Sequence, residues 1–329
     1  MNGPAKRLAE LGEFGAIELF RELAAAYRPP GLVPLVGIGD DAAVWTPSPG
    51  ASIVATTDIL IEGVHFALDY MSWHEVGWKA MAVNLSDIAA MGARPVAALL
   101  TAALKATMTQ VAAQDLFRGL LECAAEHGTW IAGGDTVLSP NDSSVGVSLY
   151  GESTQPERLL RRDRARVGDS IALTGPLGAA AAALRLWQQQ ELLPEPLRQA
   201  LVRPQPRLQR GQALAEAGIR CAMDVSDGLV ADLGKLCRAS GVGARIETQL
   251  VPISPGVADY FEPDAALRLA LAGGEDYELL ACGQRELLQP QAPFIIGRIV
   301  EGEDVTVINE HGAPLALPHT GYDAFLPHA

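Results

Sequence analysis

The sequence has few cysteines, few aromatic residues and too few basic residues to balance its acids. It contains 4 Cys and 5% Phe, Trp and Tyr, and its 39 Asp and Glu against 25 Lys and Arg give a formal net charge of −14. Such a charge repels nucleic acid phosphates and anionic membrane surfaces, so neither is expected as a partner. The cysteines form no Cys-x-x-Cys pair, which argues against a zinc site and against a disulfide framework.

Long apolar runs are also missing. The longest candidate membrane run, residues 170–184, is interrupted by Gly-Pro-Leu-Gly and is shorter than a bilayer span requires. The first residues, "MNGPAKRLAELGEF", lack the apolar core of a signal peptide. We therefore expect a cytoplasmic protein whose thiols are buried in a reducing compartment.

The common nucleotide-binding and catalytic motifs are absent from the sequence. There is no G-x-x-x-x-G-K-[ST] loop, no G-x-G-x-x-G opening a helix, no H-R-D or D-F-G set and no G-x-S-x-G elbow. The six histidines show no paired metal spacing, and no EF-hand loop occurs. Phosphoryl chemistry in this chain would therefore depend on carboxylate-held metal ions and arginine.

Strand and helix patterns alternate along the chain, which predicts an α/β fold in two domains. In the first half we expect helices at about 13–27, 74–91 and 110–127, and strands at 52–60, 95–104 and 143–152. A charged, turn-rich stretch with five arginines, "STQPERLLRRDRARVGDS", marks the boundary between domains over residues 1–150 and 151–329. In the second half we expect strands at 170–175 and 221–226, and helices at 177–190, 207–217 and 227–239.

Acidic residues recur beside glycine or at the ends of expected elements. They occur in the strings "GIGDD", "TTD", "NLSD", "GGD", "DVSDG" and "GGED". Glycine permits close backbone approach, so an acid beside it can be presented to a ligand. An Asx-turn or a helix cap explains any single one of these acids better, but the repetition favours a shared site.

Two of these strings carry sharper arguments. Asp87 shares one face of an apolar helix with Asn84, where a carboxylate is costly unless it is paired with Lys79 or binds a metal ion. In "DVSDG", helix capping by Ser226 or Asp227 explains one carboxylate well and two poorly. All these groups are hard oxygen donors, and Mg²⁺ completed by phosphate oxygens is the favoured ligand.

Taken together and in order, the motifs resemble those of the thiamine-monophosphate kinase family, within the aminoimidazole ribonucleotide synthetase superfamily. The matching strings are "GEF", "GIGDDAAV", "TTDILIEGVHF", "KAMAVNLSDIAAMGARP", "GGDT", "DVSDGLVADL", "GGEDYELL" and "GYDAF". The resemblance implies Mg²⁺- and ATP-dependent phosphorylation of thiamine monophosphate to thiamine diphosphate by direct in-line transfer. It also implies an N-terminal mixed-sheet domain that pairs across a homodimer, and a C-terminal α/β sandwich domain that closes the nucleotide and substrate cleft.

The resemblance implies roles for individual residues. The shell of several magnesium ions is implied for Asp41, Thr56, Thr57, Asp58, Asp87, Asp135, Asp224 and Asp227, with Asp40 in support. Of these, the resemblance implies catalytic roles for the carboxylates of Asp41, Asp87, Asp135, Asp224 and Asp227. ATP contacts are implied for Gly134, Asp135, Ser226 and Arg161, with the adjacent Arg162 as the alternative arginine, and substrate contacts for His65, Glu275 and Tyr322.

Two other functions are compatible with the same acids. Another small-molecule phosphotransferase or ATP-dependent synthetase of the superfamily would keep the acidic motifs and change the substrate pocket. A Ca²⁺-stabilised structural or sensor protein would use them for metal binding alone. ATP turnover and the identity of the product distinguish the three.

Overall fold

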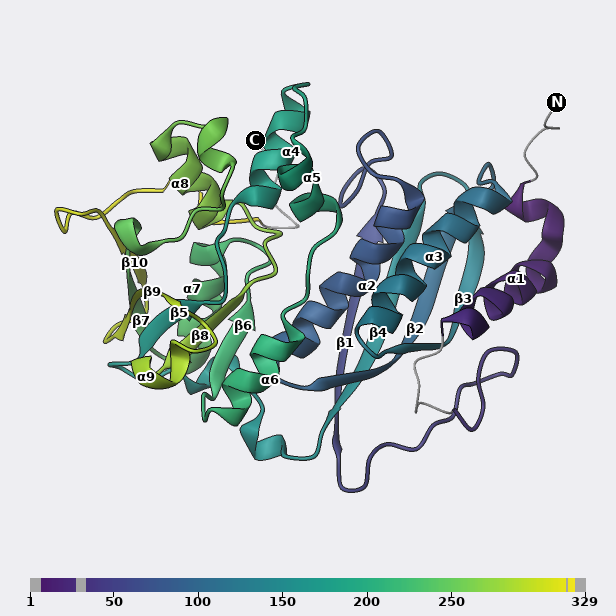
Figure 1. Ribbon diagram of the computed structural model, residues 1–329, viewed down its shortest axis with the longest axis horizontal. Coiled ribbons are helices and arrows are strands. Elements are labelled where there is room, and N and C mark those ends of the chain that lie inside the picture. The colour runs from purple at the N-terminus through teal and green to yellow at the C-terminus, as the bar shows by residue number, and fades with distance from the viewer. Residues whose placement is uncertain (1–6, 28–33, 318, 323–329) are drawn as a thin grey trace. The chain divides into compact units, whose positions relative to one another are not determined.

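The computed structural model describes residues 7–27, 34–317 and 319–322. The chain divides into two compact units, the first comprising Met1–Ile88 and Arg94–Thr154 and the second comprising Ala89–Ala93 and Gln155–Ala329. Each unit contains one mixed sheet together with helices, as the ribbon shows (Figure 1). The α/β fold class expected from the sequence is therefore confirmed.

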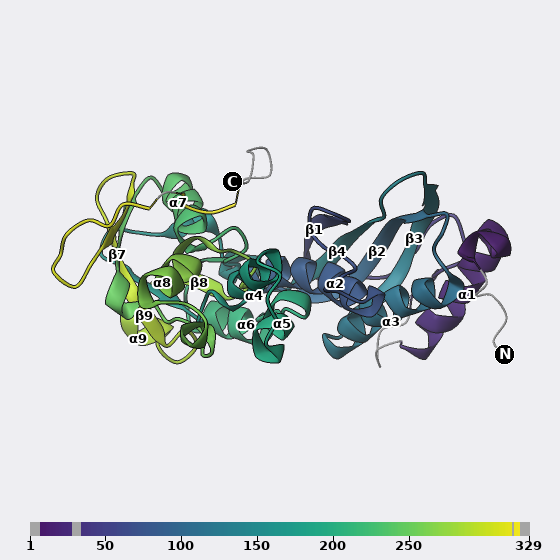
Figure 2. The same cartoon turned by 90° about the horizontal axis from the view of Figure 1, so that it is seen from above.

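The first unit is built on a four-stranded sheet of order β1-β4-β2-β3. Its strands are β1 (Ser52–Ile61), β2 (Arg94–Lys105), β3 (Trp130–Ser139) and β4 (Ser144–Ser153), and its helices are α1 (Gly12–Ala26), α2 (Trp73–Ala90) and α3 (Gln110–Glu126). Strand β4 pairs antiparallel with both β1 and β2, whereas β2 and β3 are parallel. Helices α2 and α3 cover one face of this sheet (Figures 1 and 2).

Helices α2 and α3 touch through their backbones at two glycines. A Cβ atom added to Gly77 would lie 1.9 Å from the carbonyl oxygen of Leu116, and one added to Gly119 would lie 1.8 Å from that of His74. No side chain fits at either position, so the two helices pack at a distance that only glycine allows.

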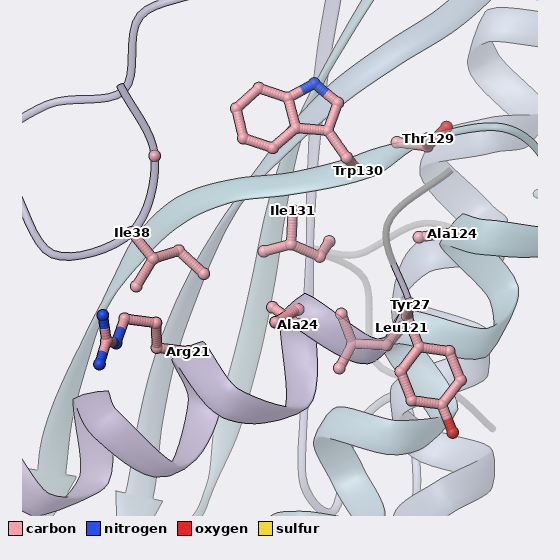
Figure 3. A pocket seen from close by; sticks show the side chains of 11 residues that line it. Arg21, Ala24, Tyr27, Ile38, Leu121, Ala124, Thr129, Trp130 and Ile131 are labelled. Carbon is pink, nitrogen blue, oxygen red and sulfur yellow. The ribbon is translucent and has the colours of Figure 1, made fainter. Parts of the chain in front are cut away.

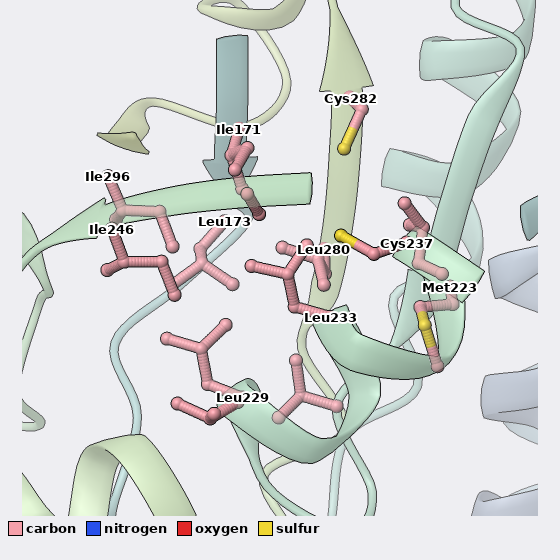
Figure 4. Close-up of a cluster of buried hydrophobic side chains, with 14 of the residues drawn as sticks. Ile171, Leu173, Met223, Leu229, Leu233, Cys237, Ile246, Leu280, Cys282 and Ile296 are labelled. Carbon is pink, nitrogen blue, oxygen red and sulfur yellow. The ribbon is translucent and has the colours of Figure 1, made fainter. Parts of the chain in front are cut away.

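The second unit is built on a six-stranded sheet of order β10-β7-β9-β5-β8-β6. Its strands are β5 (Ser170–Leu173), β6 (Cys221–Asp224), β7 (Gly243–Glu247), β8 (Leu279–Gly283), β9 (Phe294–Val300) and β10 (Val305–Ile308). Its α-helices are α4 (Ala179–Gln188), α5 (Glu195–Val202), α6 (Leu208–Glu216), α7 (Leu229–Ser240), α8 (Pro263–Ala272) and α9 (Arg285–Leu288). Helix α7 packs Leu229, Leu233 and Cys237 against one face of the sheet (Figure 4).

Most expected helices form within two residues of their predicted ends, and the differences have local causes. The helix expected at 227–239 begins only at Leu229, because Gly228 takes a φ of 119° that no helix contains. The helix expected from residue 177 begins at Ala179 after Gly178, whose φ is 93°. Within the described ranges, no helix is both long enough and apolar enough to cross a bilayer. All four cysteines are buried.

Candidate functional site

In the first unit, the expected site residues Thr56 and Asp87 lie in direct contact. The Thr56 hydroxyl on β1 donates a hydrogen bond to the Asp87 carboxylate on α2, the helix that covers this face of the sheet. Asp58 follows two residues after Thr56 and therefore shares its face, because side chains alternate along a strand. Asp58 is exposed and Asp87 is partly buried. This face thus carries a hydroxyl and two carboxylates.

Thr57 and Asp135 belong to the opposite face of the same sheet. Thr57 donates from its hydroxyl to the carbonyl of Val147 at 3.1 Å. Asp58 aligns across the sheet with Gly134, and Asp135 aligns with Thr101 in the next row. Strand alternation therefore separates these two residues from Thr56 and Asp58. For Asp135 the sequence could not show this, because β3 was not predicted.

Gly134 has a structural reason to be glycine. A Cβ atom at this position would lie 2.1 Å from the carbonyl oxygen of Leu100 on β2, so a side chain has no room. Both Gly134 and the following Asp135 are exposed, so a ligand can reach the backbone there.

Asp40 and Asp41 lie in an exposed segment before β1. The Asp40 carboxylate accepts a hydrogen bond from the Asp41 backbone N–H at 2.8 Å, which is the local turn chemistry of aspartate. Asp40 therefore orients the backbone of Asp41. The segment continues to Trp45, whose ring packs against Tyr150 with 5.6 Å between centroids.

His65 follows β1 in a tight turn. Its Nδ1 atom accepts a hydrogen bond from the backbone N–H of Ile61 at 3.1 Å. The backbone N–H of His65 donates to the Ile61 carbonyl at 2.8 Å. Because Nδ1 acts as an acceptor, the proton of the neutral ring is on Nε2. The neutral ring of His65 therefore has its single N–H group at Nε2.

In the second unit, the "DVSDG" and "GGEDYELL" motifs are joined by three backbone hydrogen bonds. The Val225 N–H donates to the Glu278 carbonyl and the Tyr277 N–H donates to the Val225 carbonyl, both at 2.8 Å. The Glu275 N–H donates to the Ser226 carbonyl at 2.7 Å. Asp224, at the end of β6, is buried beside this junction with 3% of its surface exposed. The structure therefore brings Asp224, Ser226 and Glu275 together.

The "GYDAF" motif reaches the same loop. The Tyr322 N–H donates to the Asp227 carbonyl at 2.8 Å, and the Ala231 N–H donates to the Thr320 carbonyl at 3.0 Å. The Tyr322 residue is 37% exposed. Residues 323–325 of this motif lie outside the described residues. Three motifs that are distant in the sequence thus form one site on the second unit.

The "GGEDYELL" loop is strained. Glu275 and Tyr277 have φ angles of 59° and 51°, in the left-handed region that costs a non-glycine residue about 1–2 kcal/mol. The hydrogen bonds to "DVSDG" hold this conformation, and Glu278 anchors it further. The buried Glu278 carboxylate accepts from the Thr174 hydroxyl at 2.6 Å and from Nε of Arg207 at 3.0 Å. Strain of this kind gathers at functional sites.

Asp276 lies between the two strained residues. Its Oδ1 accepts a hydrogen bond from the Gly178 N–H at 2.8 Å, at the start of α4. Burial raises the pKa of the Asp276 carboxyl well above its usual range, despite the Gly178 hydrogen bond. Its Oδ2 atom is buried with no hydrogen-bond partner among the described residues. The surroundings of Asp276 therefore disfavour the charged form of its carboxyl group.

Two residues of α7 that the sequence did not single out support the "DVSDG" loop. The buried Asp232 carboxylate accepts hydrogen bonds from the N–H groups of Ser226 and Asp227, both at 2.9 Å. Lys235 pairs with Asp232 at 2.7 Å and also with the Asp227 carboxylate. Burial lowers the pKa of Lys235, but its hydrogen bonds to Asp227 and Asp232 outweigh burial and raise the pKa above its ordinary value. The three-residue spacing of Asp232 and Lys235 is the signal that could have revealed them.

This arrangement differs from the helix capping weighed for Ser226 and Asp227. The N-cap of α7 is Gly228, and no side chain caps the helix there. The reverse occurs: the side chain of Asp232, inside the helix, receives the backbone N–H groups of the preceding loop.

Arg161, expected to contact ATP, is held by a neighbour. Its Nε and Nη2 atoms donate to the two carboxylate oxygens of Asp163 at 2.9 and 2.5 Å. The side chain is 51% exposed. The adjacent Arg162 is exposed as well.

The oxygen donors of the two units fit magnesium by their chemistry. In the part of the chain that the structure describes, no group of three His, Cys, Asp or Glu side chains is close enough to hold a metal ion alone. Magnesium is usually bound through one or two carboxylates plus waters and substrate phosphates, so it does not need such a cage. The hydroxyl and carboxylates around Thr56 and Asp87 fit this type of site.

A separate cavity of about 290 Å³ lies in the first unit (Figure 3). Its walls include Arg21 and Tyr27 near the start of the chain, Ile38, and Trp130 at the start of β3. None of the expected site residues lines it.

Comparisons with known proteins agree with the motifs. Residues 39–153 match the family described as AIR synthase related protein, N-terminal domain, and residues 166–309 match the corresponding C-terminal domain family. The fold and site thus define an AIR synthase related protein. The chain is 34% identical to the thiamine-monophosphate kinase of Synechococcus elongatus, over 98% of this chain and 99% of that protein. It therefore belongs to the thiamine-monophosphate kinase family.

Solved structures give the same result. The thiamine-monophosphate kinase of Stenotrophomonas maltophilia K279a superposes with a TM-score of 0.80 at 38% identity, covering 90% of this chain and 96% of that one. AaThiL complexed with AMPPCP and TMP superposes with a TM-score of 0.76 at 32% identity, covering 98% of this chain and 100% of that one.

Proposed function

We propose that this chain transfers the γ-phosphoryl group of ATP to thiamine monophosphate and so forms thiamine diphosphate. The main support for this proposal is the near full-length similarity of the chain to thiamine-monophosphate kinases, one of which was solved with AMPPCP and TMP. AMPPCP has the shape of ATP but cannot pass on its γ-phosphoryl group. The joined "DVSDG", "GGEDYELL" and "GYDAF" motifs support the assignment, because they place carboxylates and an aromatic residue at one site.

In this proposal each unit contributes a different set of binding residues. Residues 1–150 carry most of the metal- and ATP-binding groups, namely Asp41, Thr56, Thr57, Asp58, Asp87, Gly134 and Asp135. Residues 151–329 add Asp224, Ser226 and Asp227, an arginine at 161 or 162, and Glu275 and Tyr322 for the substrate, which His65 also contacts. Magnesium ions held by these carboxylates would neutralise the charge between the two anionic reactants.

The chemistry needs positioning more than reactive groups. Phosphoryl transfer proceeds through a loose transition state in most analyses, so alignment and charge neutralisation supply most of the acceleration. The acceptor is itself a phosphate that is largely ionised near neutral pH, and no strong general base is needed. The donor Nε2–H of His65 is suited to a phosphate oxygen. We therefore propose direct in-line attack of the acceptor phosphate on the γ-phosphorus.

The proposal is tested by an acceptor scan. Purified protein is incubated with ATP, Mg²⁺ and thiamine monophosphate, and in parallel with thiamine and with other phosphate monoesters, and ADP release is coupled to a spectrophotometric readout. Thiamine diphosphate formed only from thiamine monophosphate would support the assignment. Turnover of another acceptor alone would contradict it, and label remaining on the protein after incubation with γ-labelled ATP would contradict in-line transfer.

We further propose that the first unit pairs with a second copy through its open sheet face. Among the described residues of this unit, no helix covers that face (Figure 2). It exposes Ile53, Ile59 and Ile61 on β1 and Val137 on β3, with 51, 53, 36 and 51% of each residue accessible. A row of exposed apolar side chains on a sheet is typical of an interface. Sedimentation at the mass of a single 34.7 kDa chain would contradict the dimer.

Replacing Tyr322 is expected to weaken the binding of thiamine monophosphate selectively. The thiazolium ring carries a permanent positive charge, and an aromatic face beside a cation contributes about 0.5–2 kcal/mol, or about 2- to 30-fold in affinity. Tyr322→Ala should raise KM for thiamine monophosphate within this range and leave KM for ATP unchanged. The backbone bond to Asp227 does not depend on the side chain, so the loop should stay in place.

Tyr322→Phe is the control, because it keeps the ring and removes only the hydroxyl. It should remain close to wild type. If Tyr322→Phe and Tyr322→Ala raise KM for thiamine monophosphate equally, the effect belongs to the hydroxyl group. If KM for ATP rises together with KM for thiamine monophosphate, Tyr322 supports the fold and not the thiamine site.

A further inference from the structure

The Lys235 ammonium lies between two carboxylates that differ in their surroundings. Asp232 is fully buried, whereas about a third of the Asp227 side chain is exposed, 32%, and a similar fraction of Lys235, 34%. A buried ion pair and a half-exposed one therefore share a single cation.

The two carboxylates also differ in how firmly they are fixed. Asp232 accepts from the N–H groups of Ser226 and Asp227 through one oxygen and from Lys235 through the other, so both of its oxygens are engaged. Losing any of these bonds would leave a buried carboxylate under-satisfied, which is costly. The bond between Lys235 and Asp227 is nearer to solvent, and such pairs contribute little net free energy. Lys235 thus has one permanent partner and one exchangeable partner.

Asp227 is also one of the residues that bind magnesium in the proposed function. A divalent cation and an ammonium group on the same carboxylate repel each other strongly at contact distance. Lys235 can move away from Asp227 without losing all compensation for its charge, because Asp232 remains paired with it.

We propose that Lys235 is a positioning residue that holds the Asp227 carboxylate in the metal-free enzyme and gives it up to a divalent cation, while Asp232 keeps the lysine anchored. This inference rests on the proposed function. Lys235 then competes with the metal, and Asp232 limits that competition by sharing the ammonium group.

The test measures metal binding rather than activity. Binding of Mn²⁺ to the full-length protein is followed by electron paramagnetic resonance in the presence of saturating AMPPCP. Lys235→Met removes the competing cation and should tighten Mn²⁺ binding by about 2- to 5-fold, the range expected for a partly exposed ion pair. Lys235→Gln, which stays polar, should act in the same direction if the methionine variant folds poorly.

Arg118→Met is the matched control. Arg118 forms an ion pair with Asp115 at three-residue spacing on α3, and both side chains are more exposed than Lys235. The change alters the net charge by the same amount as Lys235→Met, so unchanged Mn²⁺ affinity would exclude a general charge effect.

Asp232→Asn should act in the opposite direction. Its amide oxygen can still accept from Ser226 and Asp227, but Lys235 loses its anchor and is left to Asp227 alone. Mn²⁺ binding should therefore weaken, and adding Lys235→Met to this variant should restore it.

Two results would overturn the inference. Unchanged Mn²⁺ affinity in Lys235→Met would show that the lysine does not compete, and weaker binding would show that it contacts the nucleotide phosphates instead. If the wild-type protein binds no Mn²⁺ with AMPPCP, the proposed function itself fails.

Discussion

Asp224→Asn and Asp87→Asn are each expected to lower kcat by at least about 100-fold and to leave the fold intact. Asparagine keeps the size of the side chain and one acceptor oxygen, so Thr56 can still donate to residue 87. Only the negative charge is lost. Substitutions next to metal ligands typically cost 10- to 100-fold, and loss of a ligand's charge should cost at least as much.

The measurement is kcat at saturating ATP and thiamine monophosphate over a range of Mg²⁺ concentrations. Asp115→Asn is the control, because this carboxylate lies on α3 in an exposed ion pair with Arg118. Its activity should equal that of the wild type. Near-normal kcat for both site variants at high Mg²⁺ would remove Asp87 and Asp224 from the metal shell.

Gly119→Ala is expected to destabilise the first unit by about 3 kcal/mol or more, and to lower its Tm by about 6–12 °C. The added Cβ would lie 1.8 Å from the carbonyl oxygen of His74, which is backbone of α2 and cannot rotate away as a side chain can. Helices α2 and α3 must therefore separate. Differential scanning calorimetry measures the change.

Gly234→Ala is the matched control for a helix glycine. On α7 the added Cβ would meet the flexible end of Arg238 at 3.5 Å and a methyl group of Val305 at 4.0 Å, both ordinary van der Waals contacts. Because alanine favours a helix over glycine, this variant should gain about 0.5–1 kcal/mol. A similar gain in both variants would mean that helix propensity, and not the contact between α2 and α3, governs the result.

Local patterns were sufficient to predict most elements of the first unit, but in the second unit strands β7 to β10 and helices α5, α8 and α9 were not predicted. The β-branched run at 52–60 and the helix at 110–127 both form, and the helix begins where Thr109 accepts a hydrogen bond from the Ala112 N–H. Strand β3 was missed because its sequence, "WIAGGDTVLS", contains two adjacent glycines that weaken a strand pattern. Without β3, the face on which Asp135 lies could not be derived.

The site shows the same limit. Sequence order suggested that "DVSDG", "GGEDYELL" and "GYDAF" act together, and the structure joins them through backbone hydrogen bonds. Backbone pairing leaves no mark on residue identity, so the partners could not be read from the motifs. Lys235 and Asp232 were missed for a different reason: a charged pair on a helix is usually a solvated surface pair, and only burial distinguishes Asp232.

The hydrogen bond from Tyr322 to Asp227 has a consequence for the order in which the protein matures during synthesis. Tyr322 follows Asp227 by 95 positions, and translation adds about 5–20 residues per second. The "DVSDG" loop therefore leaves the ribosome about 5–20 s before Tyr322, which donates the hydrogen bond to Asp227, has been synthesised. Nascent chains that have released β10 but not yet Tyr322 should contain the sheet of the second unit with this loop still open to proteases, and the site should close only when Tyr322 emerges.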